Sequence, residues 1–198
     1  MPTEKMINIV EPKSIMTKLP HTKLSSWIEW LIIKINSYVI WLWPILMVVI
    51  VFNVLMRYLF GVGRVEFEEL QWHMYSIGWI IGLSYCVVQD EHVRVDVLYE
   101  RFSFKARCWV ELLGMLFLLI PFLIVVIIYS VPFILYSWEL SEVSAAPGGL
   151  PYRWFIKSFL FFGFSLLILA VVAKLTRVIK YLVSGDTLIN GKGSEDGN

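Results

Sequence analysis

The sequence predicts an all-α membrane protein with four transmembrane helices and an interfacial amphipathic helix ahead of them. Three observations support this fold class. Hydrophobic residues make up 58% of the 198-residue chain and charged residues only 17%, whereas a soluble domain carries about 25% charged residues. The hydrophobic residues form stretches long enough to cross a bilayer core, which takes about 20 apolar residues. Charged residues gather at the ends of these stretches.

The small net charge and the short chain limit the possible functions. A formal net charge of +1 argues against a nucleic-acid partner. The chain has room for one membrane domain and for no sizeable soluble domain. The two cysteines, Cys86 and Cys108, lack metal or redox spacing and are predicted to be core or interface residues. We find no nucleophile beside a base, no phosphate loop and no metal-spaced cluster, so we predict no enzyme activity, no cofactor and no metal site.

The N-terminal part is predicted to form a flexible cytoplasmic tail over residues 1–22, followed by a short helix. Ser25 and Ser26 are candidate N-caps for this helix. One face carries polar residues and the other large apolar residues, which is typical of a helix in the headgroup layer. A plain extension of the first transmembrane helix is the alternative. The polar face holds Ser25, Ser26, Glu29 and Asn36, and the apolar face holds Trp27, Trp30, Leu31 and Ile35.

The four-helix membrane domain is predicted to occupy residues 23–183, and a second flexible cytoplasmic tail residues 184–198. The third span contains Pro121 and Pro132, either of which can kink it. The second helix is expected to begin at Glu66, ahead of its apolar stretch. The fourth continues as a basic helix through Lys174, Arg177 and Lys180. The spans lie near residues 37–58, 70–89, 110–136 and 154–173.

The basic residues predict the orientation, because cytoplasmic segments of membrane proteins are enriched in Lys and Arg. Most of the 17 basic residues lie before the first span, after the second or after the fourth. We therefore predict that both termini are cytoplasmic. These residues are Lys5, Lys13, Lys18, Lys23, Lys34, Arg94, Arg101, Lys105, Arg107, Lys174, Arg177, Lys180 and Lys192; the other side has Arg57, Arg64, Arg153 and Lys157.

Four charged residues surround the first hairpin. Arg57 ends the first span, and Glu66, Glu68 and Glu69 open the second after a short loop. Carboxylates in a first helical turn are stabilised by the helix dipole, and an arginine can bind one through two hydrogen bonds. Two interpretations remain open, a pair within this subunit and a polar contact to a partner membrane subunit. A proton or sodium relay is less favoured, since relays place acidic groups deep in a bundle.

The second span carries a histidine and two glycines. His73 follows Glu69 by one turn, so the two can share a face. We interpret His73 as a hydrogen-bonded interface residue, because haem binding between membrane helices needs a second histidine near a span. Gly78 and Gly82 form a small-xxx-small pair that lets another helix approach closely. Packing within this subunit and packing against a partner are both compatible with that pair.

Two loops carry further candidate contacts. His92, Arg94 and Asp96 alternate with valines after the second span. These residues form either a solvated loop that dips into the headgroup layer or a site that holds a neighbouring chain. In the outer loop, Pro147-Gly-Gly-Leu-Pro151 leads into the fourth helix, and the Pro and Gly residues predict a rigid turn.

The order of several of these motifs resembles that of a transporter family. Arg57-Tyr58, Glu68-Glu69, Trp79 and His92-Val-Arg94-Val-Asp96 are similar to the pattern of small membrane subunits (Q-type, DctQ-like) of TRAP transporters, the tripartite ATP-independent periplasmic transporters. The stretch Pro147–Trp154 is similar too, and the resemblance covers about residues 37–173.

The resemblance implies a four-span subunit of a secondary transporter in the bacterial inner membrane. Its partners would be a large, elevator-type membrane subunit and, transiently, a periplasmic binding protein that delivers an organic acid. The small subunit would act as a scaffold for sodium-coupled import, in contact with membrane lipids. By analogy, the candidate structural or intersubunit contacts are Arg57, Glu68, Glu69, His92 and Asp96, and none of these would touch substrate. The residue patterns described above add Glu66, His73 and Arg94 as candidate contacts, and Gly78 and Gly82 as close packing positions.

Two other classes of protein are considered as alternatives. A small stand-alone four-helix transporter generally needs an acidic residue well inside a span, whereas Glu69 and Glu111 lie near span ends. A membrane anchor of a redox complex would need haem-ligating histidines, and His73 is the one histidine near a span. Both alternatives are therefore less favoured than the scaffold.

Overall fold

The computed structural model describes residues 19–91 and 102–184, and every regular element in these ranges is a helix. The predicted tails therefore lie outside the described residues, apart from residues 19–22 and 184. The elements are α1 (Lys23–Val39), α2 (Leu42–Phe60), α3 (Val65–Gln89), α5 (Phe104–Gly114), a π-helical turn (Met115–Leu119), α6 (Ile120–Glu139) and α7 (Arg153–Ser184).

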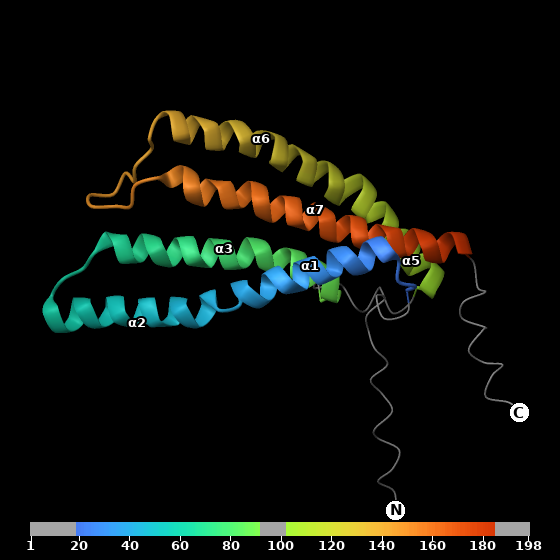
Figure 1. Cartoon of the computed structure of the whole chain (residues 1–198), viewed down its shortest axis with the longest axis horizontal. Coiled ribbons are helices and arrows are strands. Elements are labelled where there is room, and N and C mark those ends of the chain that lie inside the picture. The colour runs from blue at the N-terminus through green and yellow to red at the C-terminus, as the bar shows by residue number, and fades with distance from the viewer. Residues whose placement is uncertain (1–18, 92–101, 185–198) are drawn as a thin grey trace, which may run out of the picture.

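The four long helical segments lie side by side in one layer (Figure 1). The order across the layer is α2, α3, α7 and α6, because α3 packs against both α2 and α7, and α6 packs against α7. α1 lies over α7 and α3 near one end of the layer. Because the layer is one helix thick, most side chains of α2 and α6 point away from the rest of the chain.

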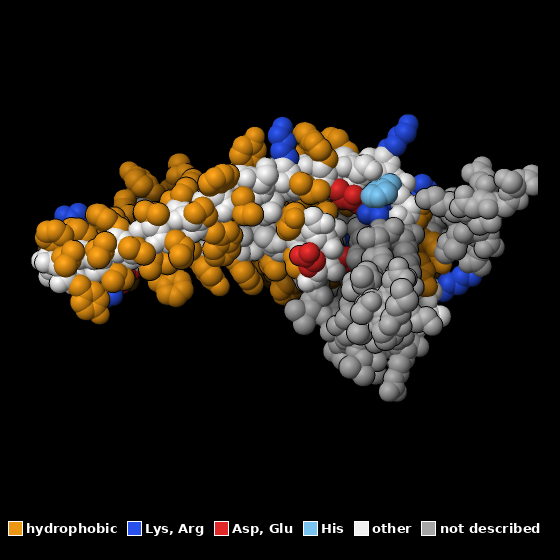
Figure 2. Space-filling view, turned by 90° about the horizontal axis from the view of Figure 1, so that it is seen from below, with side chains coloured by type: hydrophobic (Ala, Val, Ile, Leu, Met, Phe, Trp, Pro, Cys, Tyr) orange, Lys and Arg blue, Asp and Glu red, His pale blue; other side chains and the backbone are white. Residues whose placement is uncertain are grey.

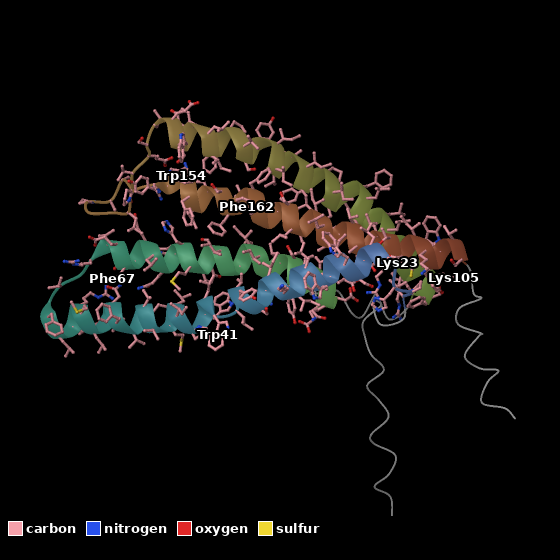
Figure 3. The ribbon with its side chains drawn as sticks, in the orientation of Figure 1. Lys23, Trp41, Phe67, Lys105, Trp154 and Phe162 are labelled. Atoms are coloured by element: carbon pink, nitrogen blue, oxygen red, sulfur yellow. The ribbon has the colours of Figure 1, made fainter. Side chains whose placement is uncertain are left out.

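The two outer helices, α2 and α6, run in one direction along the layer, and the two inner helices, α3 and α7, run parallel to each other in the opposite direction. The layer therefore has two ends. At what we call the loop end, residues 61–64 join α2 to α3 and residues 140–152 join α6 to α7. At the other end, the terminal end, α1 begins and α7 finishes. Figure 3 shows Lys23 and Lys105 at the terminal end and Phe67 and Trp154 towards the loop end.

Three helical segments of the described chain are long and apolar enough to cross a membrane. They are Lys23–Phe60, Phe104–Glu139 and Arg153–Ser184, and they contain the predicted first, third and fourth spans. α3 has 25 residues and a length of about 37 Å, but it carries polar residues along its length and is not among these three. The prediction of a fourth crossing therefore stays a prediction.

The first membrane helix is longer than predicted, because α1 and α2 follow one another with a short break at Ile40 and Trp41. The break precedes Pro44, which has no N–H to donate to the carbonyl of Ile40 and so cannot complete a regular helical turn there. The location of α1 in the headgroup layer stays a prediction.

The N-cap of α1 differs from the one predicted. Thr22, not Ser25 or Ser26, precedes the helix, and its hydroxyl accepts a hydrogen bond from the Ser25 N–H at 3.0 Å. The Ser25 hydroxyl in turn accepts one from the Thr22 N–H at 3.1 Å. This capping box satisfies two N–H groups that a free helix end leaves without partners. Ser25, Ile28 and Ile32 are buried, whereas the rings of Trp27 and Trp30 are exposed.

The third predicted span contains a π-helical turn, which explains how the chain accommodates Pro121. A proline ring clashes with the carbonyl four residues earlier, here that of Phe117. The turn at Met115–Leu119 relieves this clash, and the N–H of Ile120 donates to the carbonyl of Met115, five residues back. Pro132, by contrast, lies inside the regular helix α6.

The hydrophobic core lies towards the terminal end, where α1, α3, α5 and α7 meet. Val171 and Val178 of α7 are fully buried there, together with Cys108, for which the core is thus the outcome among the predicted core and interface locations. Elsewhere few residues are buried. In the most apolar 18-residue stretch of Phe104–Glu139, for example, only 11% is buried inside the chain. Lipid or another protein must therefore cover the broad faces of the layer. Figure 2, which looks onto the α2 edge of the layer, shows hydrophobic side chains along the length of that edge as well.

Candidate functional site

At the loop end, the carboxylate of Glu69 holds the outer loop of the chain against α3. It accepts a hydrogen bond from the Leu150 N–H at 2.6 Å and another from the Ser144 hydroxyl. The loop is closed on itself by a bond from the Ser144 N–H to the Leu150 carbonyl at 3.3 Å. Glu69 thus joins two segments that lie about 80 residues apart in the sequence, and it does so within one subunit.

Gly149 is required where this loop approaches α3. A Cβ atom at position 149 would lie 2.4 Å from the Cβ of Ser144 and 3.0 Å from the Oε1 of Glu69. Both distances are shorter than a van der Waals contact. Gly148 precedes it with φ +78°, a conformation that glycine adopts without steric cost. The Pro- and Gly-rich stretch thus forms a turn, and this turn also packs against Glu69.

The contact predicts a pH dependence. The Ser144 hydroxyl and the Leu150 N–H, in that order, lower the pKa of Glu69 from its ordinary value of 4.5. A lowered pKa means that the contact stabilises the fold above pH 4.5 and that this stabilisation is lost as pH falls through the folded pKa. We expect the protection of the Leu150 amide against hydrogen exchange, relative to its intrinsic rate, to fall as pH drops below 4.5, and Glu69→Gln should remove this step.

Glu142 serves as the control for that experiment. Lys157, and after it Ser137, lowers the pKa of Glu142 in the same direction, so both carboxylates contribute to acid sensitivity. Because Glu142 does not contact Leu150, Glu142→Gln should leave the pH step at Leu150 in place. A step that survives Glu69→Gln would contradict the assignment.

A second polar contact at the loop end is partly exposed. Arg57 Nη1 lies 3.7 Å from Glu68 Oε1, and each side chain is about half exposed. The Arg57 guanidinium also lies 5.9 Å from the ring centroid of Tyr58. Exposed pairs of this kind contribute up to about 1 kcal/mol. Glu66 lies beside the outer loop, with its Oε1 4.0 Å from the position that a Cβ of Gly148 would take.

Lys157 connects α7 to the end of α6. Its ammonium group pairs with the carboxylate of Glu142 and lies 4.0 Å from the ring centroid of Phe133. Close by, the rings of Trp138 and Trp154 meet edge to face at 4.5 Å. These contacts, together with those of Glu69, fix the outer loop to three helices.

His73 lines an open groove between α3 and the start of α7. The groove has a volume of about 470 Å³ and its other lining residues, among them Met74, Ile77 and Phe155, are mostly apolar. His73 therefore lies on the side of α3 that faces α7. His73 and Glu69 interact electrostatically across one helical turn, without a hydrogen bond between them.

The two glycines of α3 have different surroundings. A Cβ at Gly78 would lie 3.2 Å from the ring of Trp43 in α2, so this position packs within the subunit. A Cβ at Gly82 would meet nothing within 4 Å. Sequence reasoning missed a third and closer approach: a Cβ at Gly163 of α7 would lie 1.8 Å from the Cγ2 of Ile80. The signal for it was the one glycine inside the fourth span.

At the terminal end, Lys174 bridges two carboxylates from other helices. Its Nζ lies 2.6 Å from Asp90 Oδ1 and 2.5 Å from Glu111 Oε2. The side chain of Lys174 is 6% exposed and that of Asp90 is fully buried. Asp90 ends α3 in the left-handed conformation, with φ 61°. One lysine thus ties α7 to the ends of α3 and α5.

Arg177, one turn further along α7, binds the N-terminal part of the chain. Its Nη1 lies 3.0 Å from Glu29 Oε1, and its Nη2 donates to the carbonyl of Leu19 at 3.0 Å. The Thr22 and Thr176 hydroxyls meet beside it at 3.4 Å. Glu29 belongs to the predicted polar face of α1, and its carboxylate points towards α7.

Sequence reasoning used Lys174 and Arg177 only as indicators of orientation. Their roles as buried ties were missed because each partner lies far away in the sequence, at a distance of 84 residues for Asp90 and 148 for Glu29. His92, Arg94 and Asp96 lie outside the described residues. Within the described ranges, no group of three or more His, Cys, Asp or Glu residues could hold a metal ion.

Comparison with known protein families decides the class of protein. Residues 46–180 match the model of the family described as tripartite ATP-independent periplasmic transporters, DctQ component. This range covers well over half of the chain. The chain belongs to the DctQ family. Comparisons with curated proteins and with solved structures gave no match.

The family assignment makes this chain a small membrane subunit of a TRAP transporter, as the resemblance predicted. DctQ components in general function with a large membrane subunit and a periplasmic binding protein, and they are transport components without a catalytic role. The matched range includes Asp90, Glu111 and Lys174 together, so the Lys174 bridge lies wholly within the DctQ region. Glu29 precedes that range, so the contact of Arg177 with α1 reaches outside it.

Proposed function

We propose that this DctQ component is the scaffold of a sodium-coupled TRAP transporter that imports an organic acid. In this role it binds the large elevator-type membrane subunit and enlarges the stationary part of the complex. The periplasmic binding protein delivers the substrate and meets the complex transiently. The chain itself binds neither substrate nor sodium.

The distribution of polar contacts carries the proposal. The ion pairs of the described residues lie at the two ends of the layer, with Arg57, Glu142 and Lys157 at the loop end and Lys174 and Arg177 at the terminal end. Carriers, by contrast, place ionisable or unwound segments at mid-depth to bind substrate and ions. A chain that is rigidly tied at both ends and apolar between them suits a stationary support.

We further propose that α3 is the fourth membrane crossing and that the terminal end faces the cytoplasm of a bacterium, in the inner membrane. α3 lies between α2 and α7, and both neighbours belong to segments of membrane-spanning length. A crossing at α3 also returns the chain from the loop end, where α2 finishes, to the terminal end. The described basic residues of the terminal end, including Lys105, Lys174 and Lys180, support a cytoplasmic location for that end.

Reconstitution into liposomes tests this function. The purified chain, the large subunit and their complex are each incorporated into separate vesicles, with the binding protein, substrate and a sodium gradient supplied outside. We expect uptake only where the large subunit is present, and full uptake only with both subunits. Saturable uptake by this chain alone, or failure of the tagged chain to co-purify with a large membrane subunit, would contradict the proposal.

A further inference from the structure

The exposed side of α3 differs from that of an ordinary lipid-facing helix. Trp72 and Trp79 are 69% and 53% exposed, and Ser76 lies between them at helical spacing, so the three form one stripe. An indole N–H is a donor that hydrocarbon cannot satisfy. Tryptophan is enriched at membrane interfaces, yet Trp79 lies near the middle of the 25-residue helix.

A hollow beside this stripe contains a polar group without a partner. It has a volume of about 180 Å³, lies between α2 and α3, and is lined by Leu46, Ile50, Gln71, Trp72 and Tyr75. The side-chain nitrogen of Gln71 is buried and has no hydrogen-bond acceptor among the described residues. Leaving a buried donor unsatisfied is unfavourable, so an acceptor from another molecule would complete the site.

Gly82 leaves room for that molecule further along the helix. No atom of the described chain lies within 4 Å of the position of a Cβ at Gly82, whereas the Gly78 position is filled by Trp43. Small residues with free space in front of them allow a second helix to approach closely in a membrane. The open glycine, the hollow and the tryptophan stripe all belong to the α3 face, which we define as Gln71, Trp72, Ser76, Trp79 and Gly82.

The outer surface of α6, which forms one edge of the layer, provides the contrast. Its exposed middle part is aliphatic or phenyl, apart from one tyrosine hydroxyl, and contains no indole or amide. This surface suits hydrocarbon. It consists of Phe122, Ile124, Val125, Ile128, Tyr129 and Val131.

We propose that the α3 face binds a transmembrane helix of the large subunit, which supplies a hydrogen-bond acceptor to Gln71, while α6 faces lipid. The inference rests on the proposed function, because it names where the partner is bound. It follows from polarity: a helix with an indole at mid-depth and an unpartnered amide is better covered by protein than by acyl chains. The half-exposed pair of Arg57 and Glu68 lies at the loop end of the same two helices.

Photo-crosslinking in the co-expressed complex tests the location. Benzoylphenylalanine is placed at Trp79 in one variant and at Phe122, an aromatic residue of α6 that is 57% exposed, in the control. A third variant carries it at Phe155, in the groove between α3 and α7. We expect irradiation to join the chain to the large subunit, identified by mass spectrometry, only from position 79.

Assembly of the complex tests the role of Gln71. We expect Gln71→Leu to lower the yield of co-purified large subunit about fivefold, as the loss of one hydrogen bond would. Gln89→Leu is the control, because Gln89 is exposed near the other end of α3 and donates to the Tyr85 hydroxyl of its own helix. Assembly unaffected by Gln71→Leu would overturn the assigned hydrogen bond.

The failures of the two proposals can be told apart. A complex that co-purifies but crosslinks from position 122 or 155, and not from 79, overturns the location while the scaffold function stands. A product that joins two copies of this chain through position 79 also overturns it. If the unmodified chain does not co-purify with a large membrane subunit, the proposed function and this inference both fail.

Discussion

Replacing Lys174 with Met is expected to destabilise the protein by about 3–5 kcal/mol, the usual cost of removing one partner from a buried ion pair. Two carboxylates, those of Asp90 and Glu111, then lose the ammonium group that bridges them. The Asp90 side chain is fully buried, so water cannot replace that group without local opening. The measurement is the thermal unfolding midpoint of the purified subunit, in detergent and in its complex.

Lys180→Met is the matched control for this prediction. It lies on the same helix and removes the same charge from the same end of the chain, so it has the same effect on membrane orientation. Lys180 is exposed and donates one hydrogen bond, to the His21 carbonyl at 2.8 Å, so its loss should cost about 0.5–1 kcal/mol. Equal losses in the two variants would mean that both lysines act only as topological signals.

Replacing Gly163 with Ala is expected to be the second most damaging change, at about 1–3 kcal/mol, the usual cost of overpacking a well-packed site. The new methyl group would lie 1.8 Å from the Cγ2 of Ile80 and 3.2 Å from its Cβ. Ile80 cannot turn away easily, because a β-branched side chain in a helix has one strongly preferred rotamer. The helices α3 and α7 would therefore have to separate.

Two further variants make this prediction specific. Gly82→Ala introduces the same methyl group where nothing lies within 4 Å, so the unfolding midpoint of the purified subunit without its partner should not fall. In an Ile80→Ala background, Gly163→Ala should cost less than it does alone, because the clashing atoms are gone. Additive losses from Ile80→Ala and Gly163→Ala would contradict a direct contact between the two residues.

The two predictions concern different kinds of contact between the same helices. Lys174 ties α7 to α3 electrostatically at the terminal end, and Gly163 lets the backbones of α3 and α7 approach closely nearer the loop end. A third tie, from Glu69 to the outer loop, closes the loop end. A scaffold needs rigid spacing between its helices, and these contacts supply it without any polar cluster at mid-depth among the described residues.

Several features of the fold could be predicted from local pattern. α3 starts at Val65, one residue before the predicted start at Glu66. This start could be predicted because acidic residues after a Gly-containing loop are a clear signal for the beginning of a helix. The fourth span and its basic continuation are one helix, α7, as predicted. The N-cap of α1 was placed wrongly, because Thr22, Ser25 and Ser26 are all capable caps and only the geometry selects among them.

The candidate site was only partly predictable, for the same physical reason. The sequence identified Glu69 as a polar contact and left its partner open. The partner is a turn of its own chain, with Ser144 and the Leu150 N–H as donors. The sequence identified Gly78 and Gly82 as a pair, but only Gly78 is filled from within. Neighbours in space cannot be deduced from helical spacing alone, since spacing gives the face and not what covers it.

The sequence by itself determined that this is a helical membrane protein, where most of its helices lie and which family it resembles. Those properties are local, because hydropathy, capping and motif order need only neighbouring residues. Only the tertiary structure decided that the helices form one open layer, that Lys174 and Arg177 are buried ties, and that Gly163 lies where α3 and α7 approach closely. Each of these depends on atoms brought together from distant parts of the chain, and their distances are set by packing, which no single segment encodes.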